Sequence, residues 1–178
     1  MRFRKWLPLL LILAMLAPMA YPLQTEAAVK INTKKATIVK GMYKTLKITG
    51  TSKKVKWTSS KKSVATVSSK GKVTAKKPGT CTIKAKVGKK TYTCKITVIS
   101  TSRVYKKVFN YVTKRYSSAR AWDARVSGRY YYIYFFKPQG EGAVGLDVKV
   151  DLLTGWVYFG SGRAEFFSKL PKKVRLWK

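Results

Sequence analysis

Histidine is absent from this chain of 178 residues, and six carboxylates accompany 39 lysines and arginines, which gives a net charge of +33. Without imidazole there is no Ser–His or Cys–His nucleophile, no imidazole base and no histidine ligand for a metal. A carboxylate pair remains as a catalytic option, but Asp147 and Asp151 on one strand would lie about 13 Å apart. Glycosidases require roughly 5 to 9.5 Å. The composition therefore predicts a protein that is not an enzyme and uses no metal or cofactor.

Carboxylates are missing altogether from residues 29–100, which contain twenty lysines and no arginine. No side-chain ion pair can form within this segment, so its counter-charges must come from solution or from a partner. The absence favours a polyanionic partner. The alternative is that the lysines only keep the surface soluble.

A long hydrophobic run occurs once, at residues 6–20, between a basic N-terminus and a polar stretch that ends in small residues. A run of about 15 residues is short for a membrane span, which needs about 20. Residues 1–27 are therefore predicted to be a secretory signal peptide. The alternative is an uncleaved N-terminal anchor. We expect a secreted, extracellular protein that associates with the cell envelope through its charge.

The composition changes near residues 100–102, which predicts two domains, at 28–99 and 103–178. The first is rich in Lys, Thr, Val and Ser, and its apolar residues alternate with polar ones between glycine-containing turns. A period of two with frequent turns is typical of short antiparallel strands that bury one face. We predict a small β-sandwich with the lysines on its solvent face.

Four sequence blocks in the first domain carry a family resemblance. They are residues 55–60 (VKWTSS), 63–68 (SVATVS), 71–75 (GKVTA) and 79–85 (GTCTIKA). In their order and spacing they resemble the bacterial Ig-like domain, group 2, over about residues 29–98. The resemblance implies an Ig-like sandwich of the kind found in bacterial surface proteins, adhesins and cell-wall proteins, where it serves as a spacer or binding module. It implies no catalytic residues.

The two cysteines, Cys81 and Cys94, have the parity of core residues on two strands that are joined around Gly88. If Ala85 lies opposite Lys90, Cys81 faces Cys94 and a disulfide can form. In an exported chain such a bridge would stabilise by about 3 kcal/mol. The alternative is a pair of buried, reduced thiols.

The second domain begins with apolar residues at helical spacing from Val104 to Tyr116, after Ser102 as a possible N-cap. Strand-like segments follow at 121–126, 129–137, 144–151 and 156–159. We predict one helix packed on a four-stranded antiparallel sheet. The whole chain is thus predicted to be mostly β, with an Ig-like β-sandwich followed by a small α+β domain.

The segment 147–157 (DVKVDLLTGWV) resembles the last hairpin of PepSY-like domains. Some domains of that kind are associated with protease propeptides and inhibition, so the resemblance implies a peptidase-modulating role as an alternative function. In physical terms, Asp151 and Gly155 are expected to form the turn of this hairpin.

The strand at residues 130–136 (YYYIYFF) is apolar or aromatic on both faces. If its odd-numbered residues pack under the helix, its tyrosines stand on the open face beside two arginines, where they suit sugars, peptides or another protein. The alternative is that these rings pack on the neighbouring domain or on the C-terminal segment. The possible ligand face comprises Tyr130, Tyr132, Tyr134, Arg125 and Arg129.

Two binding functions follow. In the first, the protein is a non-catalytic surface protein that adheres to teichoic acid, other anionic cell-wall polymers or acidic glycans. In the second, it binds a peptide or modulates a peptidase through the C-terminal domain. Nucleic acid is expected to bind only non-specifically, because no reading motif is present. The predicted polyanion-binding residues are Lys53, Lys54, Lys56, Lys61, Lys62, Lys76, Lys77, Lys84 and Lys86.

Overall fold

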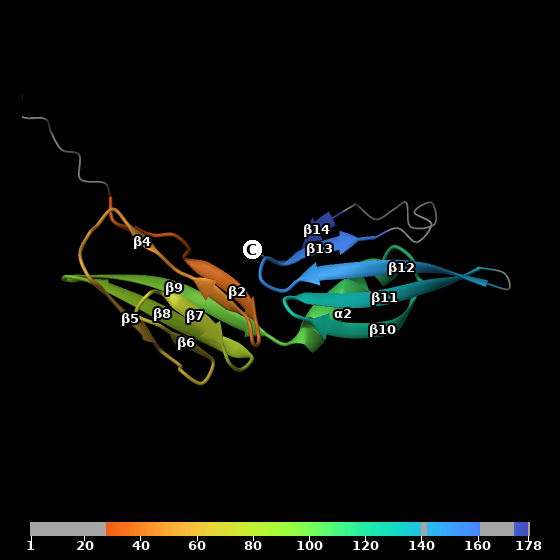
Figure 1. The fold of residues 1–178 in the computed structure, drawn as a ribbon, viewed down its shortest axis with the longest axis horizontal. Helices are drawn as coiled ribbons and strands as arrows, with labels where there is room; N and C mark the ends of the chain where they lie inside the picture. Colours follow the sequence, from red (N-terminus) through yellow and green to blue (C-terminus); the bar gives the residue numbers. More distant parts are fainter. Residues whose placement is uncertain (1–27, 140–141, 161–172, 178) are drawn as a thin grey trace, which may run out of the picture.

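A computed structural model describes residues 28–139, 142–160 and 173–177, which form two lobes that lie end to end (Figure 1). The predicted signal peptide at residues 1–27 lies outside the described residues. The strands of the first lobe are β1 (Lys30–Ile31), β2 (Lys35–Val39), β3 (Tyr43–Thr45), β4 (Ile48–Thr49), β5 (Val55–Ser59), β6 (Ala65–Val67), β7 (Lys72–Ala75), β8 (Gly79–Val87) and β9 (Lys90–Ile99). The second lobe contains α2 (Thr101–Thr113), β10 (Arg120–Ser127), β11 (Tyr130–Gln139), β12 (Gly142–Asp151), β13 (Trp156–Phe159) and β14 (Lys173–Arg175).

The first lobe is the predicted β-sandwich. Its larger sheet has the order β2-β9-β8-β5, with β2 parallel to β9 and the other pairs antiparallel. A three-stranded sheet, β3-β7-β6, and the short pair β1-β4 complete the lobe. The predicted alternation holds, because every second residue of β8 from Cys81 to Val87 is buried. The core of this lobe joins Ile83 and Ile96 of the larger sheet to Val73 and Ala65 of the smaller one.

The β8–β9 hairpin has a tighter turn than the sequence suggested. Gly88, at a φ of 56°, allows a two-residue turn, so that Val87 pairs with Lys90. This shifts the expected register by two residues and places Cys94 opposite Ile83 rather than opposite Cys81.

The disulfide prediction is therefore wrong in this structure, where both cysteines are free and buried. Diagonal neighbours on one sheet face lie about 7 to 8 Å apart, whereas the Cβ atoms of a disulfide are about 3.5 to 4.5 Å apart. The alternative of two reduced thiols holds. Burial raises the pKa of Cys94 to about 11, although the nearby Lys44 ammonium opposes the shift.

Thiol titration checks this arrangement. At pH 8, a pKa of about 11 leaves about one Cys94 thiol in a thousand ionised, and burial also raises the pKa of Cys81. We therefore expect neither cysteine of the native protein to react with a disulfide reagent within minutes. In guanidinium chloride without reductant, both thiols should react. Failure to detect any thiol after unfolding would mean that the chain is bridged.

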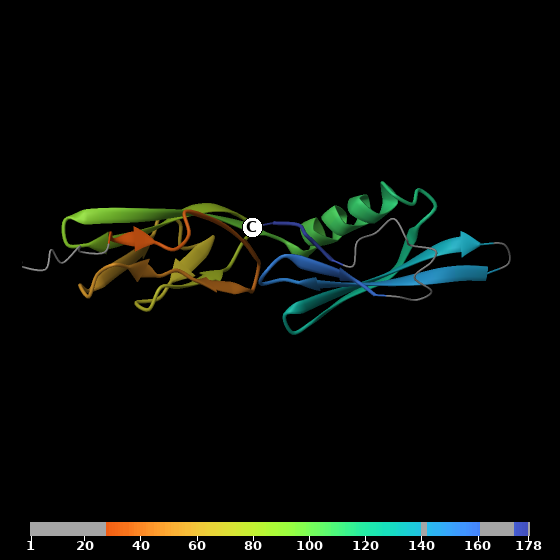
Figure 2. The ribbon, with the colours of Figure 1, turned by 90° about the horizontal axis from the view of Figure 1, so that it is seen from above.

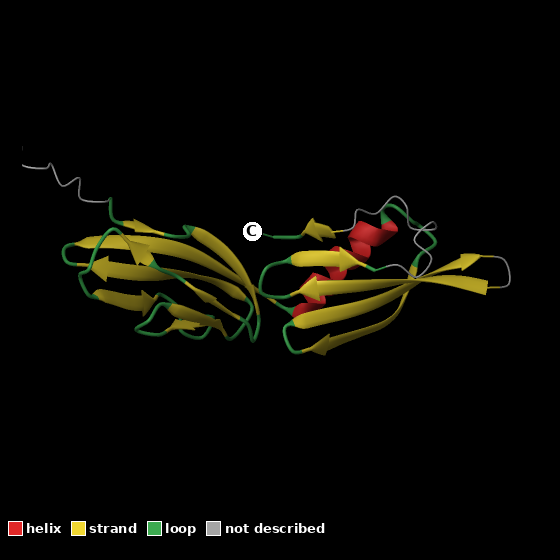
Figure 3. Ribbon diagram, turned by 45° about the horizontal axis from the view of Figure 1, so that its top comes forward, coloured by secondary structure: helices red, strands yellow, loops and turns green. Residues whose placement is uncertain are grey.

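In the second lobe, one helix covers one face of an antiparallel sheet of order β10-β11-β12-β13-β14 (Figures 2 and 3). The helix buries Val104, Val108 and Val112, and the sheet presents Ile133 and Phe135 to the same core. The predicted α+β architecture is confirmed. The predicted sheet lacked β14, because a strand of only three residues is too short for its alternation to be recognised in the sequence.

The junction between the lobes is a single residue, Ser100, between the end of β9 and the start of α2. Its hydroxyl caps the helix by accepting a hydrogen bond from the backbone N–H of Arg103 at 3.2 Å, so the cap is Ser100 and not Ser102. Val39 and Ile99, both from the first lobe, belong to the hydrophobic core of the second. Within the described residues, no helix has the length and apolar character needed to span a bilayer.

Gly71 is the most constrained turn of the sandwich. Its φ is 78°, and a Cβ there would lie 2.3 Å from the carbonyl oxygen of Leu46 and 3.1 Å from the Trp57 ring. Gly88 also has a positive φ, but a Cβ there would meet nothing within 4 Å.

We expect Gly71→Ala to lower the free energy of unfolding by at least about 3 kcal/mol, since backbone must move in addition to the left-handed strain. Gly88→Ala should cost only about 1 kcal/mol, the strain alone. Denaturant unfolding of both variants measures the difference. Equal losses would contradict the close approach at Gly71.

Candidate functional site

The outer face of the larger sheet of the sandwich carries lysine and threonine, except for Val39 and Ile99 at the end that packs on the second lobe. The strand register and the alternation of burial place twelve side chains outward on β2, β5, β8 and β9. Five are ammonium groups and seven are hydroxyls, so the face offers hydrogen-bond donors and positive charge with no carboxylate. We call it the Lys/Thr face. It comprises Lys35, Thr37, Lys56, Thr58, Thr80, Thr82, Lys84, Lys86, Thr91, Thr93, Lys95 and Thr97.

Two pairs of lysines face each other directly across neighbouring strands of this face. Lys56 of β5 lies opposite Lys86 of β8, and Lys35 of β2 lies opposite Lys95 of β9. Like charges at directly opposed positions destabilise a sheet. The positive charge of these pairs is not compensated by any carboxylate of the same lobe, because residues 29–100 contain none.

A hollow of about 560 Å³ lies beside the edge strand β5 and is lined by three lysines. Lys54 and Lys56 border it from the β5 side and Lys86 from β8, while Ser69 and the Trp57 ring complete the wall. Three lysines and a serine at the border of one hollow suit a phosphate or sulfate group. All three lysines were among the predicted polyanion-binding residues.

The other predicted lysines lie elsewhere on the sandwich. Four of them lie near Val64, in the loop before β6. The Val64 carbonyl accepts hydrogen bonds from the backbone N–H groups of Lys76 and Lys77, and its N–H donates one to the Lys61 carbonyl. Lys53 lies in the loop before β5, where its backbone N–H bonds to Thr51. We call the loop cluster the end group: Lys61, Lys62, Lys76 and Lys77. The prediction omitted Lys35 and Lys95, whose outward position follows from the parity of their strands.

The open face of the C-terminal sheet carries the predicted tyrosines, each partly exposed. Arg125 donates a hydrogen bond to the Tyr134 hydroxyl at 3.0 Å, and the Tyr130 and Tyr132 ring centroids lie 6.4 Å apart. Lys149 stands over the Tyr130 ring, 4.9 Å from its centroid. The helix covers the opposite face of the sheet, as Figure 2 shows, so this face is left without a helix layer.

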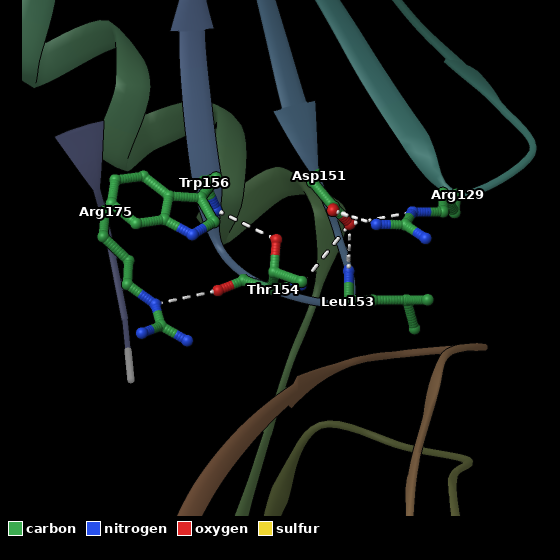
Figure 4. Close-up of polar contacts among 6 residues, drawn as sticks. All are labelled: Arg129, Asp151, Leu153, Thr154, Trp156 and Arg175. Carbon is green, nitrogen blue, oxygen red and sulfur yellow. Dashed lines mark hydrogen bonds and ion pairs between the residues drawn. The ribbon is translucent and has the colours of Figure 1, made fainter. Parts of the chain in front are cut away.

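Arg129, which was predicted to belong to the ligand face, instead stabilises a turn of the fold. It forms an ion pair with Asp151, which is 3% exposed and also accepts hydrogen bonds from the backbone N–H groups of Leu153 and Thr154 (Figure 4). Burial raises the pKa of the Asp151 carboxyl, but the hydrogen bonds from Arg129, Thr154 and Leu153 outweigh burial and lower it below its usual value. Asp151 and Gly155 thus form the turn between β12 and β13, as expected.

A groove of about 580 Å³ opens on the same face between β10, β11 and β12. It unites the predicted residues Arg125 and Tyr134 with Trp122, Phe136, Gly145 and two carboxylates, Asp123 and Asp147. Trp122 is 81% exposed. Sequence reasoning missed it because a β-bulge between Ala121 and Asp123 interrupts the alternation of β10.

Residues 26–98 match the family of bacterial Ig-like domains, group 2. The N-terminal lobe is a bacterial Ig-like domain. The resemblance of the C-terminal hairpin to PepSY-like domains stays a prediction.

Solved structures similar to this chain include domains 4 and 5 of the S-layer protein SbsC, which are 26% identical over 40% of this chain and 51% of that chain, with a TM-score of 0.34. Domains 5–6 of the same protein are 16% identical over 65% of this chain and 63% of that one, with a TM-score of 0.34. The present chain thus spans about half the length of the first of these structures. No curated protein matches the chain.

Repulsion on the Lys/Thr face of the Ig-like domain gives a measurable salt effect. We expect Lys56→Thr to raise the free energy of unfolding by about 0.2 to 1 kcal/mol at low salt, because it removes the charge opposite Lys86. The gain should vanish near 1 M NaCl, where the Debye length is about 3 Å. Denaturant unfolding at both salt concentrations measures it, with Lys53→Thr, at a loop position that has no lysine opposite it across a strand pair, as the control. A gain that is the same at both concentrations would rule out charge repulsion as its cause.

Proposed function

We propose that this protein is an exported, non-catalytic cell-surface protein whose Ig-like domain adheres to anionic polymers of the cell envelope. Teichoic acids and acidic glycans are the polymers with the fitting chemistry. The observation that carries the proposal is the Lys/Thr face, where the twelve outward positions that the second lobe does not cover are lysine or threonine. The family match supports a surface location, since bacterial Ig-like domains of this group are found in bacterial surface proteins.

The spacing of the lysines suits a polymer with repeated anionic groups. Outward residues on one strand, such as Lys84 and Lys86, are about 7 Å apart, and neighbouring strands are separated by about 4.8 Å. Lys56, Lys84 and Lys86 thus form one cluster on β5 and β8, and Lys35 and Lys95 form a second on β2 and β9. Threonine hydroxyls between them can donate hydrogen bonds to the same phosphate or carboxylate oxygens.

A bound anion would also reduce the electrostatic repulsion between the lysines of the Lys/Thr face. An anionic group between Lys56 and Lys86 turns a repulsive pair into two attractive contacts. Binding of this kind releases small counter-ions, so its affinity falls as salt rises. An alternative in which lysines act only as a solubilising surface would give no dependence on which lysines are present.

Sedimentation with isolated Gram-positive cell walls, with and without teichoic acid, tests the proposal. The face variant Lys56→Gln/Lys84→Gln/Lys86→Gln should lose at least about tenfold in affinity, because each lysine near an anionic surface contributes about 1 kcal/mol. The matched control Lys61→Gln/Lys62→Gln/Lys76→Gln removes the same charge from the end group and should lose much less.

Two results would contradict the proposal. Equal losses in the face and end-group variants would show that total charge, and not the Lys/Thr face, governs binding. Undiminished binding to walls without teichoic acid would exclude teichoic acid as the partner, and binding that ignores salt between about 50 mM and 500 mM would exclude any anionic polymer.

A further inference from the structure

The groove on the open face of the C-terminal sheet differs in shape from the Lys/Thr face. Its wall is the exposed indole of Trp122, which meets the Phe136 ring edge-on at a centroid distance of 6.3 Å. Its floor is formed at Gly145, which lies opposite Phe136 and has no side chain to fill the space. A Cβ at Gly145 would approach only the Phe135 carbonyl oxygen, at 4.0 Å, so the fold does not require glycine there.

The charge of the groove also differs from that of the rest of the molecule. The described residues contain three carboxylates, and two of them, Asp123 and Asp147, line this groove. Asp147 forms no hydrogen bond or ion pair through its carboxylate within the described ranges, while the third carboxylate, Asp151, is paired with Arg129. One arginine, Arg125, faces the two aspartates. Although the protein has a net charge of +33, two carboxylates and one guanidinium give this groove no excess of positive charge to attract an anionic polymer.

A second hollow of about 320 Å³ continues from the first and shares Tyr134 and Asp147 with it. Its further lining includes Tyr132, Lys149 and Tyr158. The two hollows together offer aromatic rings along a path that crosses from β10 to β13. A ligand of several linked units therefore fits better than a single small molecule.

We propose that this groove binds a neutral saccharide chain, with one sugar ring stacked on Trp122. The C–H groups on one face of a pyranose rest against the negative face of an aromatic ring. Sugar hydroxyls donate hydrogen bonds to the Asp123 and Asp147 carboxylates and accept one from Arg125. Exposed aromatic rings with a few convergent polar groups in a hollow of this volume are the features of a ligand site.

The edge of the sheet argues against an extended peptide as the occupant. A peptide that adds to a sheet needs the free backbone groups of the edge strand, which here is β10. The β-bulge at Trp122 interrupts that edge, and the backbone N–H of Ala124 is bonded to the Asp123 carboxylate at 2.7 Å. Both features oppose strand addition.

The test uses a panel of neutral oligosaccharides and of blocked, extended tetrapeptides, followed by calorimetry on each ligand that binds. We expect a saccharide to bind with an affinity that rises from the disaccharide to the tetrasaccharide. The affinity should change less than about twofold between 50 mM and 500 mM NaCl, because the ligand is uncharged. This insensitivity to salt separates the groove from the Lys/Thr face.

Two variants assign the binding to the groove. Trp122→Ala should weaken binding about tenfold or more by removing the stacked ring. Gly145→Val should abolish it by filling the floor. The matched control is Ser127→Val, at an exposed position outside the groove, which should have no effect. Both groove variants should keep the binding to teichoic acid, and the face variant should keep the binding to saccharide.

The proposal is overturned if no neutral saccharide of the panel binds up to about 10 mM, or if only peptides bind. It is also overturned if Gly145→Val, with an unchanged unfolding midpoint, binds saccharide as the unmodified protein does. Each of these results leaves the adhesion of the Ig-like domain to anionic polymers unaffected, so the two proposals fail independently.

Discussion

Repulsion among lysines that no carboxylate offsets is the constraint under which the Ig-like domain folds. Its twenty lysines lie in a segment without a single acidic side chain, so burial of apolar side chains between the two sheets must outweigh their mutual repulsion. Five of the twenty lie together on the outer surface of the larger sheet, where Lys56 is directly opposite Lys86 and Lys35 is opposite Lys95. A surface of this kind gains stability from any anion that binds to it, which links its stability to its proposed function.

The carboxylates described in the second lobe lie at two sites, a turn and a groove. Asp151 holds the β12–β13 turn through Arg129 and two backbone N–H groups, and Asp123 and Asp147 line a groove beside an exposed indole. The molecule therefore presents two surfaces of different chemistry. One is uniformly cationic and suits an anionic polymer, and the other is aromatic with balanced charge and suits an uncharged ligand rich in hydroxyl groups. Ser100 joins the lobes directly, and Val39 and Ile99 extend the second core into the first lobe.

The sequence predicted the sandwich, the helix and the first four strands of the second sheet, because their apolar residues repeat with a clear period. It failed where a single turn residue sets the geometry. Gly88 permits a shorter turn than expected, and the resulting shift of two residues separates Cys81 from Cys94. The groove was only half predicted, since Arg125 and Tyr134 came from strand parity, whereas Trp122 stands at a bulge that parity cannot anticipate. The approach of Asp147 to Asp123 depends on the order of three strands, which no local pattern encodes.

The most direct test of the central claim is an NMR titration of the isotope-labelled protein with purified teichoic acid at low salt. The account predicts that shift changes concentrate on β5, β8 and β9, at outward residues such as Thr82, Lys84 and Lys86, and that added salt reverses them. Changes spread evenly over all exposed lysines, or confined to the end group at Lys61, Lys62, Lys76 and Lys77, would contradict it.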